Sequence, residues 1–446
     1  MKRIFYFLTI IMIVACADDD SFSTSSSLRL SFSKDTISLD TLFSRTPSAT
    51  YTFWVRNNND DGLRIADIHL KRRNQTGFRV NVDGSYLDNS LGSQVNDIEI
   101  RRNDSILVFV ELTTSETLQL EPTLIEDDLI FTLESGQQQM VNLRAWSWDA
   151  EKLYNPVIEG DQLIESPIPI IIYGDLTIAE GACLTLRNTT LFFHEKSGIE
   201  VLGSLSVENC LFRGDRLDRM FSNLPYDRVS GQWNGVHFHE KASGIMNNTE
   251  IRNANDAVVL DSADLDTTQV RLAMSNCIVH NCKGYGLRAV NSYVSLMDCQ
   301  FTNTLYDCVS VAGGVTDIIH CTMAQFYPFT AERGVALSFT NFSGTSAIPL
   351  HRLSCSESII TGYDKDVLFG GMRDSVTAFE FWFNNSLIRT QQVTTSDSVR
   401  FKDIIWETPN DSIQGKKHFL TIDEENLYYD FHLDPLSTAK GLGCYY

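Results

Sequence analysis

The chain has 446 residues, of which 36 are basic and 57 acidic, so its formal net charge at pH 7 is −21. A field of this sign repels nucleic acid and anionic membrane surfaces, so nucleic acid is not an expected partner. The length predicts two or three domains, and the composition is that of a water-exposed, extracytoplasmic globular protein.

The first residues have the pattern of a secretory signal peptide, residues 1–15. Two basic residues precede an apolar run from Ile4 to Val14, which is too short for a confident membrane span, and a small residue follows. The sequence I-V-A-C, which ends at Cys16, resembles the bacterial lipobox. This resemblance implies cleavage before Cys16 and a lipid on that residue. The alternative is an ordinary secreted protein with a chance cysteine.

Residues 16–27 are predicted to be a tether. The acidic sequence A-D-D-D (17–20) resembles the export signal of surface lipoproteins in Bacteroidota, and the alternative is a solvated linker. The serine-rich segment 21–27 has too little apolar surface to fold and is expected to be flexible. The resemblance implies an outer-membrane protein that is anchored through the lipid on Cys16 and exposed at the cell surface.

Residues 28–150 contain seven short runs of strand-like character, separated by turn-forming segments such as N-N-N-D-D-G (57–62). This spacing predicts an antiparallel β-sandwich. It resembles the immunoglobulin-like modules of bacterial surface proteins but lacks the Cys…Trp…Cys framework. The resemblance implies a spacer, or a cap on the next domain. The predicted runs are 28–32, 51–56, 63–70, 97–100, 105–112, 128–133 and 140–146.

Residues 151–446 carry a repeat. Cys277, Cys299 and Cys321 lie 22 residues apart, and each opens a short strand-like segment. A fixed period without a helix signal predicts a chain wound into a coil. In each unit a small residue precedes a larger apolar one by two positions, so both should face the interior. The pairs are Thr190 and Phe192, Cys210 and Phe212, Thr249 and Ile251, Cys277 and Val279, Cys299 and Phe301, Cys321 and Met323, Ser358 and Ile360, and Ser386 and Ile388.

A second set of strands runs in phase with the first and contains Ile199, Val236, Val258, Leu287 and Val309. Asparagines at 253, 281 and 303 are expected at tight left-handed corners, where stacked side chains can hydrogen-bond between turns. Together with G-Q-W-N-G-V-H-F (231–238) and the segment 431–443, this pattern resembles the right-handed parallel β-helix of the pectin-lyase-like superfamily. The expected fold class is therefore all-β, a sandwich followed by a solenoid.

Cys16 leaves nine cysteines, and most occupy the small inward position. We expect them to be buried small side chains. A zinc site built from cysteines is not indicated, because no Cys-x₂-Cys motif pairs with a second one. A disulfide between adjacent turns is geometrically conceivable at the spacing of neighbouring strands, but it is not the expectation.

Two insertions leave the coil at the same corner, 213–233 and 325–333, and four turns separate them by roughly 19 Å. The first combines carboxylates, guanidinium groups and aromatic rings, which suit a sugar because rings stack on pyranoses and Arg pairs with uronates. The alternative is that Asp and Arg pair with each other and Trp233 plugs the coil. The candidate ligand-binding residues are Asp215, Arg216, Asp218, Arg219, Tyr226, Arg228, Trp233, His237 and His239.

No catalytic residue can be assigned. Among the β-helix enzymes that the chain resembles, polygalacturonases carry paired Asp residues and pectate lyases carry Ca²⁺-binding Asp clusters. Neither motif occurs in the coil. His237 and His239 face together on a strand, yet with Glu240 they lack the H-E-x-x-H spacing and a third ligand, so no metal or cofactor is expected. The favoured function is a non-catalytic binding or scaffold protein that engages a glycan or an outer-membrane protein. The alternatives are a polysaccharide lyase or glycoside hydrolase, and an accessory subunit of an outer-membrane assembly or transport complex.

Overall fold

The computed structural model describes residues 21–221, 223–407 and 415–445, so the expectations for the signal peptide and Cys16 lie outside the described residues. Two compact units divide the chain, Met1–Asp149 and Ala150–Tyr446. In the part of the chain that the structure describes, no helix is long and apolar enough to cross a membrane.

The first unit is a β-sandwich of two five-stranded sheets. Each of the seven predicted runs overlaps a strand, and neighbouring strands are antiparallel except β2 and β10, which pair in parallel. Strand β2 was not predicted because Asp40, at φ 46°, interrupts its alternation. One sheet contains β1 (Ser31–Phe32), β3 (Tyr51–Arg56), β8 (Ser105–Leu112), β5 (Phe78–Val82) and β6 (Ser85–Tyr86); the other contains β2 (Thr36–Phe43), β10 (Gln138–Trp148), β9 (Thr123–Leu133), β4 (Leu63–Leu70) and β7 (Gln94–Ile100).

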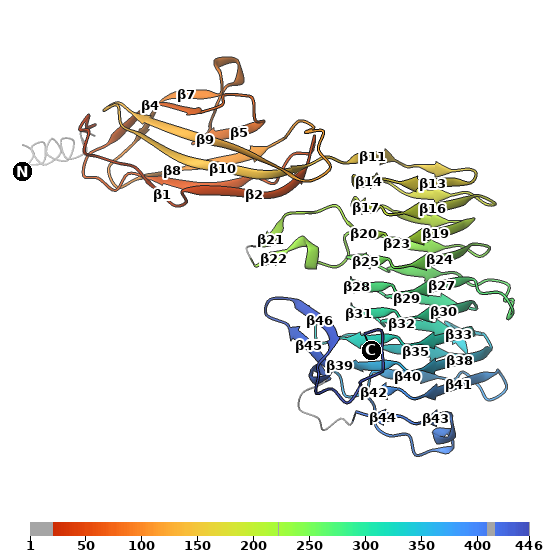
Figure 1. Ribbon diagram of the computed structural model, residues 1–446. Helices are drawn as coiled ribbons and strands as arrows, with labels where there is room; N and C mark the ends of the chain where they lie inside the picture. Colours follow the sequence, from red (N-terminus) through yellow and green to blue (C-terminus); the bar gives the residue numbers. More distant parts are fainter. Residues whose placement is uncertain (1–20, 222, 408–414, 446) are drawn as a thin grey trace, which may run out of the picture. The chain divides into compact units, whose positions relative to one another are not determined.

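The second unit is a coil of three parallel sheets, which we call sheets 1, 2 and 3 (Figure 1). Sheet 1 contains β11 (Glu151–Tyr154), β14 (Ile170–Tyr173), β17 (Thr190–Phe193), β20 (Leu211–Gly214), β25 (Glu250–Arg252), β28 (Ile278–Cys282), β31 (Gln300–Thr304), β34 (Thr322–Gln325), β39 (Ile359–Gly362), β42 (Leu387–Ile388) and β44 (Ile405–Trp406). Sheet 2 contains β12 (Val157–Ile158), β15 (Leu176–Ile178), β18 (Gly198–Val201), β23 (Gly235–Phe238), β26 (Val258–Leu260), β29 (Leu287–Val290), β32 (Val309–Ala312), β35 (Leu337–Thr340) and β40 (Leu368–Gly371). Sheet 3 contains β13 (Gln162–Glu165), β16 (Cys183–Arg187), β19 (Ser204–Glu208), β24 (Ser243–Asn247), β27 (Leu272–Ser275), β30 (Tyr293–Met297), β33 (Gly314–Ile319), β38 (Leu350–Ser356), β41 (Phe379–Asn384) and β43 (Phe401–Lys402).

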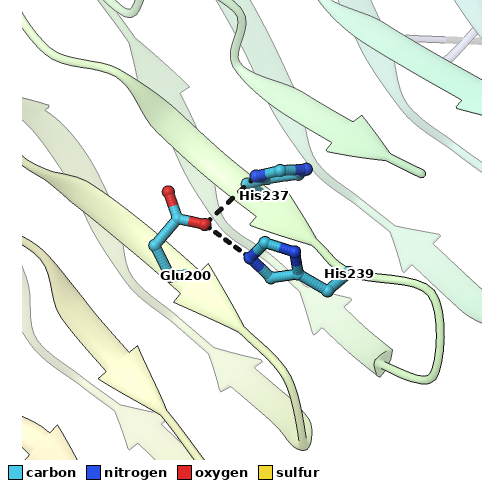
Figure 2. Close-up of side chains that lie close together, drawn as sticks. All are labelled: Glu200, His237 and His239. Carbon is cyan, nitrogen blue, oxygen red and sulfur yellow. Dashed lines mark hydrogen bonds and ion pairs between the residues drawn. The ribbon is translucent and has the colours of Figure 1, made fainter.

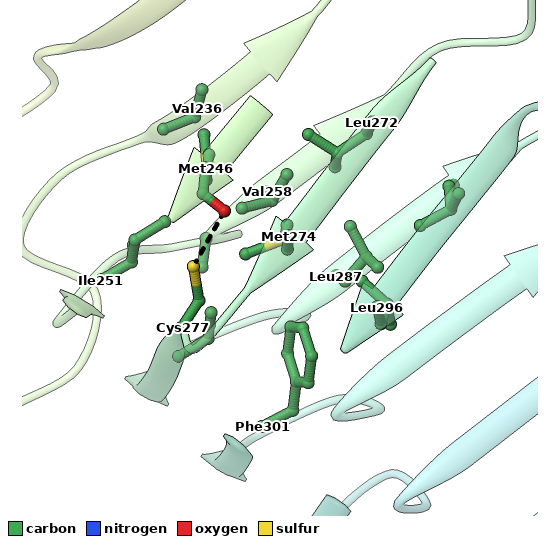
Figure 3. Packing of buried hydrophobic residues seen from close by; sticks show 14 of the residues in the cluster. Val236, Met246, Ile251, Val258, Leu272, Met274, Cys277, Leu287, Leu296 and Phe301 are labelled. Carbon is green, nitrogen blue, oxygen red and sulfur yellow. Dashed lines mark hydrogen bonds between the residues drawn. The ribbon is translucent and has the colours of Figure 1, made fainter. Parts of the chain in front are cut away.

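Side chains from all three sheets fill the interior of the coil. Figure 3 shows Val236, Val258 and Leu287 from sheet 2 packed with residues of sheets 1 and 3. The predicted sheet 2 ladder is confirmed, because Val236 pairs with Val258, Val258 with Leu287, and Leu287 with Val309. Sheet 3 was not among the strands predicted from the sequence.

The cysteine column is buried, as predicted. Cys277, Cys299 and Cys321 stand directly before their strands and have no exposed surface. Each thiol donates to the carbonyl oxygen two residues earlier, over 3.2 to 3.3 Å. All nine cysteines in the described residues are free thiols.

One predicted inward pair is shifted by one residue. Leu191 pairs with Phe212, so Leu191, rather than Phe192, occupies the inward position of its turn. Phe192 points outward, where the guanidinium of Arg213 lies 5.2 Å from its ring centroid. The error arises because the sequence N-T-T (188–190) has two threonines, and either one fits the pattern of a small inward residue. Only the pairing of the strands decides which threonine faces inward.

The asparagine corners adopt the expected backbone. Asn253, Asn281 and Asn303 have φ values of 65°, 55° and 56°. Hydrogen bonds between turns, however, run along a different corner: Asn209 Nδ2 donates to Asn188 Oδ1 over 3.1 Å, and Asn248 repeats this contact with Asn209 over 2.8 Å.

The C-terminal segment is not a turn of the coil. Sheet 1 ends at β44, and residues 415–445 contain an antiparallel hairpin of β45 (Phe419–Asp423) and β46 (Tyr428–Leu433) (Figure 1). Phe419 and Phe431 pack with Phe326 and with outward-facing residues of sheet 1, including Ile359 and Leu387. The segment 431–443, expected to belong to the repeat, therefore covers the outside of sheet 1.

Candidate functional site

The first insertion is bound closely to the coil. It leaves sheet 1 after β20, contains β21 (Arg219–Phe221) and β22 (Leu224–Pro225), and enters sheet 2 at β23. Asn253 Nδ2 donates to the carbonyls of Asp227 and Val229 over 2.9 and 3.0 Å. A corner residue of the next turn therefore holds the end of the insertion in place.

Trp233 is a core residue and offers no surface to a ligand. It is fully buried, and its ring stacks on that of Phe193 with centroids 4.1 Å apart. Its indole N–H donates to the Arg252 carbonyl over 2.8 Å. The expectation that Trp233 stacks on a sugar is therefore wrong, and the alternative that Trp233 plugs the coil is confirmed.

Two charged candidates of the insertion pair with each other, and a third pairs with a residue of the coil. Arg216 forms two hydrogen bonds with Asp218, of 2.7 and 2.6 Å, and its guanidinium lies 4.0 Å from the centroid of the Tyr226 ring. Asp215 accepts from His194 over 2.7 Å. Arg219 is an exposed residue of β21. These pairs stabilise the loop and leave one face of Tyr226 covered.

The two insertions are in contact, which differs from the expected separation of roughly 19 Å. The hydroxyl groups of Ser230 and Tyr327 lie 2.8 Å apart. In the second insertion Phe326 is fully buried beneath the C-terminal hairpin. An open face between two separated loops therefore does not form, because the two loops touch each other and the hairpin covers Phe326 of the second.

A groove of about 410 Å³ lies instead between the first insertion, sheet 1 and the C-terminal hairpin. Among the nine sequence candidates, Arg228 alone lines it. Its main polar and aromatic side chains are Asp227 and Arg228 from the insertion, Glu250, Arg252 and His280 from sheet 1, and Tyr428 and Asp430 from the hairpin.

The floor of this groove is a charged network. Asp227 forms ion pairs with two guanidinium groups: its Oδ1 lies 2.6 Å from Nη1 of Arg213 and 3.0 Å from Nη2 of Arg252. Glu250 lies 3.0 Å from Arg252 and 2.9 Å from His280. Burial alone would raise the pKa of Glu250, but the hydrogen bond from His280 and the charges of Arg252 and Arg213 lower it to about 2. Glu250 is therefore ionised at neutral pH.

The rim of the groove is aromatic. Tyr428 is half exposed (50%), and Arg228 lies 5.9 Å from its ring centroid. Arg228 also donates to the carbonyl of Asn426 over 3.2 Å, which connects the insertion to the hairpin. A flat ring beside planar, ionised polar groups can bind a ligand that has both apolar faces and hydroxyl groups.

His237 lies on sheet 2 and His239 directly after its strand, away from this groove. They face together, as predicted, with ring centroids 4.3 Å apart (Figure 2). The carboxylate beside them is not Glu240, which is exposed, but Glu200 of the preceding turn, whose Oε2 lies 3.1 Å from His237 Nδ1 and 2.7 Å from His239 Nε2. Parallel pairing brings these residues together, since Glu200 pairs with His237.

Comparison with known proteins supports the fold. Residues 172–323 match a family model described as "Right handed beta helix region". The second unit is a right-handed parallel β-helix. No curated protein matches the chain.

Among solved structures, the catalytic unit of GH87 alpha-1,3-glucanase from Streptomyces thermodiastaticus is similar over 80% of this chain and 89% of that one, at 10% identity and a TM-score of 0.29. A GH87 alpha-1,3-glucanase catalytic domain in complex with tetrasaccharides is 8% identical, with 81% and 86% coverage and a TM-score of 0.27. A family 123 glycoside hydrolase from Clostridium perfringens is 8% identical over 30% of each chain, with a TM-score of 0.21. Structural similarity at this level does not indicate what activity this chain has.

Proposed function

We propose that the protein is a binding protein of the outer cell surface that holds a saccharide in the groove between sheet 1 and the C-terminal hairpin. The supporting observation is the combination of an exposed ring, Tyr428, with a row of planar polar side chains in one groove. Aromatic rings stack on sugar faces, and carboxylate and guanidinium groups hydrogen-bond adjacent hydroxyls in fixed directions.

Binding is favoured over hydrolysis by the charge states in the groove. A glycosidase needs a carboxylic acid of raised pKa to protonate the leaving oxygen. The pKa of Glu250 is about 2, and Asp227 is paired with two guanidinium groups. Burial alone would raise the pKa of Asp430, but hydrogen bonds from His432 lower it below its usual value. Glu250 and Asp430 can therefore accept hydrogen bonds but are poor proton donors at neutral pH.

Tyr428→Ala is expected to weaken saccharide binding by about ten- to hundredfold, because removing one stacking ring from a flat ligand costs about 1–3 kcal/mol. A glycan array with the full chain identifies the ligand, and titration calorimetry measures the change. Tyr86→Ala is the matched control, since Tyr86 is an exposed tyrosine (69%) of the sandwich. Equal affinities for wild type and Tyr428→Ala would contradict binding in this groove.

Analysis of the saccharide after incubation separates the alternatives. Unchanged saccharide supports a binding protein, whereas new reducing ends or unsaturated uronates would replace this proposal with a hydrolase or a lyase. An array without any bound saccharide, together with an outer-membrane protein cross-linked to the chain in cells, would favour the accessory subunit.

The anchor is a separate part of the proposal. Cys16→Ser is expected to prevent lipidation and to move the protein from the membrane fraction to the soluble fraction, because each buried CH₂ of an acyl chain contributes about 0.8 kcal/mol to membrane binding. Fractionation with a carbonate wash measures this. Cys183→Ser, a half-buried cysteine of the β-helix, should leave the distribution unchanged. A Cys16→Ser protein that stays with the membrane would rule out the lipid anchor.

A further inference from the structure

Two imidazoles and two carboxylates gather on sheet 2 across three successive turns. Glu200 lies on β18, His237 on β23 and His239 directly after it, and Asp261 follows β26. Besides the contacts with Glu200, Asp261 Oδ2 lies 3.0 Å from His237 Nε2 and 3.6 Å from His239 Nδ1. Both ring nitrogens of each histidine therefore lie near a carboxylate oxygen.

This arrangement does not suit neutral histidines alone. A neutral imidazole has one N–H donor, so its other nitrogen directs a lone pair at whatever lies beside it. For both rings, that nitrogen would meet a carboxylate oxygen. Protonating both rings would supply the missing donors, but it would place two positive charges on rings whose centroids are 4.3 Å apart. A cation between the lone pairs and the Glu200 carboxylate removes the repulsion between lone pair and carboxylate. It also leaves both rings neutral, so that no two positively charged rings lie side by side.

We propose that Glu200, His237 and His239 bind a divalent first-row transition-metal ion, for which Zn²⁺ is the probe. His237 Nδ1, His239 Nε2 and Glu200 Oε2 are the ligand atoms. The outer nitrogens, His237 Nε2 and His239 Nδ1, then carry the protons and direct them toward Asp261, a carboxylate behind the rings of the kind that usually orients metal-bound histidine. The 3.0 Å from His237 Nε2 is a hydrogen-bonding distance, whereas the 3.6 Å from His239 Nδ1 has to shorten.

The geometry and the chemistry of the donors agree with this assignment. One ligand atom from each of the three residues lies within 4.8 Å of the others. Tetrahedral zinc with bonds of about 2.0–2.1 Å places its ligands about 3.3 Å apart, so the present separations of 3.1 and 2.7 Å from Glu200 need to open by about 0.2 and 0.6 Å. Two nitrogens and one carboxylate favour Zn²⁺, Fe²⁺ or Mn²⁺ over Ca²⁺ and Mg²⁺, which prefer oxygen ligands.

The site also has an open side. About a third of each of the three side chains is exposed: 30% for Glu200, 34% for His237 and 37% for His239. Three protein ligands leave a coordination position for water or a ligand atom, as in zinc sites that act on substrates. This inference is independent of the saccharide groove, which lies on sheet 1.

The test uses the full chain without a histidine tag, freed of metal by a chelator. Titration calorimetry with Zn²⁺ should give one ion per chain, and Co²⁺ should give the visible absorption spectrum of a nitrogen- and oxygen-coordinated ion. Glu200→Gln and His237→Ala should each weaken Zn²⁺ binding at least a hundredfold, and the orienting change Asp261→Asn about ten- to hundredfold. Circular dichroism checks that each variant is folded.

His320→Ala is the matched control, because His320 is a single imidazole placed between two carboxylates, Asp298 and Glu357. It should leave Zn²⁺ binding unchanged. The proposal is overturned if the wild-type chain binds neither ion, or if Zn²⁺ binds equally well to wild type and to all three site variants. A pair of histidines that titrate together in NMR spectra without any metal affinity would identify a proton site instead.

Discussion

Cys299→Arg is expected to abolish soluble, folded protein. The thiol of Cys299 has no exposed surface and stands in a column between Cys277 and Cys321 of the neighbouring turns. An arginine there would bury a charge with apolar neighbours, which costs several kcal/mol even after relaxation. Domains are stable by only about 5–15 kcal/mol, so the loss is a large fraction of the total. Soluble yield and the apparent melting temperature measure it.

Cys299→Ser separates this charge effect from the loss of the thiol. A serine hydroxyl can make the same bond to the carbonyl two residues earlier, as Ser358 and Ser386 do in later turns over 2.7 and 2.9 Å. The serine variant should therefore fold. An arginine variant that melts close to the wild-type temperature would mean that position 299 points outward.

Trp233→Ala is expected to destabilise the β-helix by about 3–5 kcal/mol, the usual cost of removing a large buried ring. The change removes the stack on Phe193 and leaves the Arg252 carbonyl without its indole donor. Because Trp233 ends the first insertion, the loop should also become more open to proteases. Thermal unfolding and limited proteolysis measure the two effects.

Trp146→Ala provides the comparison, since Trp146 is a tryptophan of β10 with 46% of its surface exposed. Removing it should change stability by about 0.5 kcal/mol or less, as for most surface substitutions. If Trp233→Ala changed stability as little as Trp146→Ala does, and the Trp233→Ala protein no longer bound the saccharide, Trp233 would be a ligand-binding residue after all.

The sequence could have revealed the metal-binding cluster. The ladder residues Ile199, Val236 and Val258 were recognised as equivalent positions of successive turns. Counting one residue on from Ile199 and Val236, the same alignment places Glu200 beside His237. Counting three residues on from Val236 and Val258, it places His239 beside Asp261. Strand register aligns the polar outward residues of successive turns as well as the apolar inward ones, and only the inward ones follow the repeat pattern from which the fold was predicted.

The groove could not have been predicted in the same way. Its hairpin residue Tyr428 lies more than a hundred residues from Glu250 and Arg252 in the sequence, and no period relates them. The hairpin reaches sheet 1 because Phe419 and Phe431 cover Phe326 and the outward side chains of later turns. Those outward apolar residues were the only sign in the sequence that something covers sheet 1. They do not differ in type from ordinary strand residues, so they did not predict the hairpin.

By itself the sequence determined the repeat, the buried cysteine column, the left-handed asparagine corners and seven of the ten described strands of the sandwich. These features recur between neighbours in the chain, so local chemistry displays them. The tertiary structure alone decided which threonine enters the first inward position, that Trp233 fills the core, and which groups meet in the groove. Such contacts depend on the pairing of strands and on the chain folding back to bury apolar surface, and neither leaves a period in the sequence.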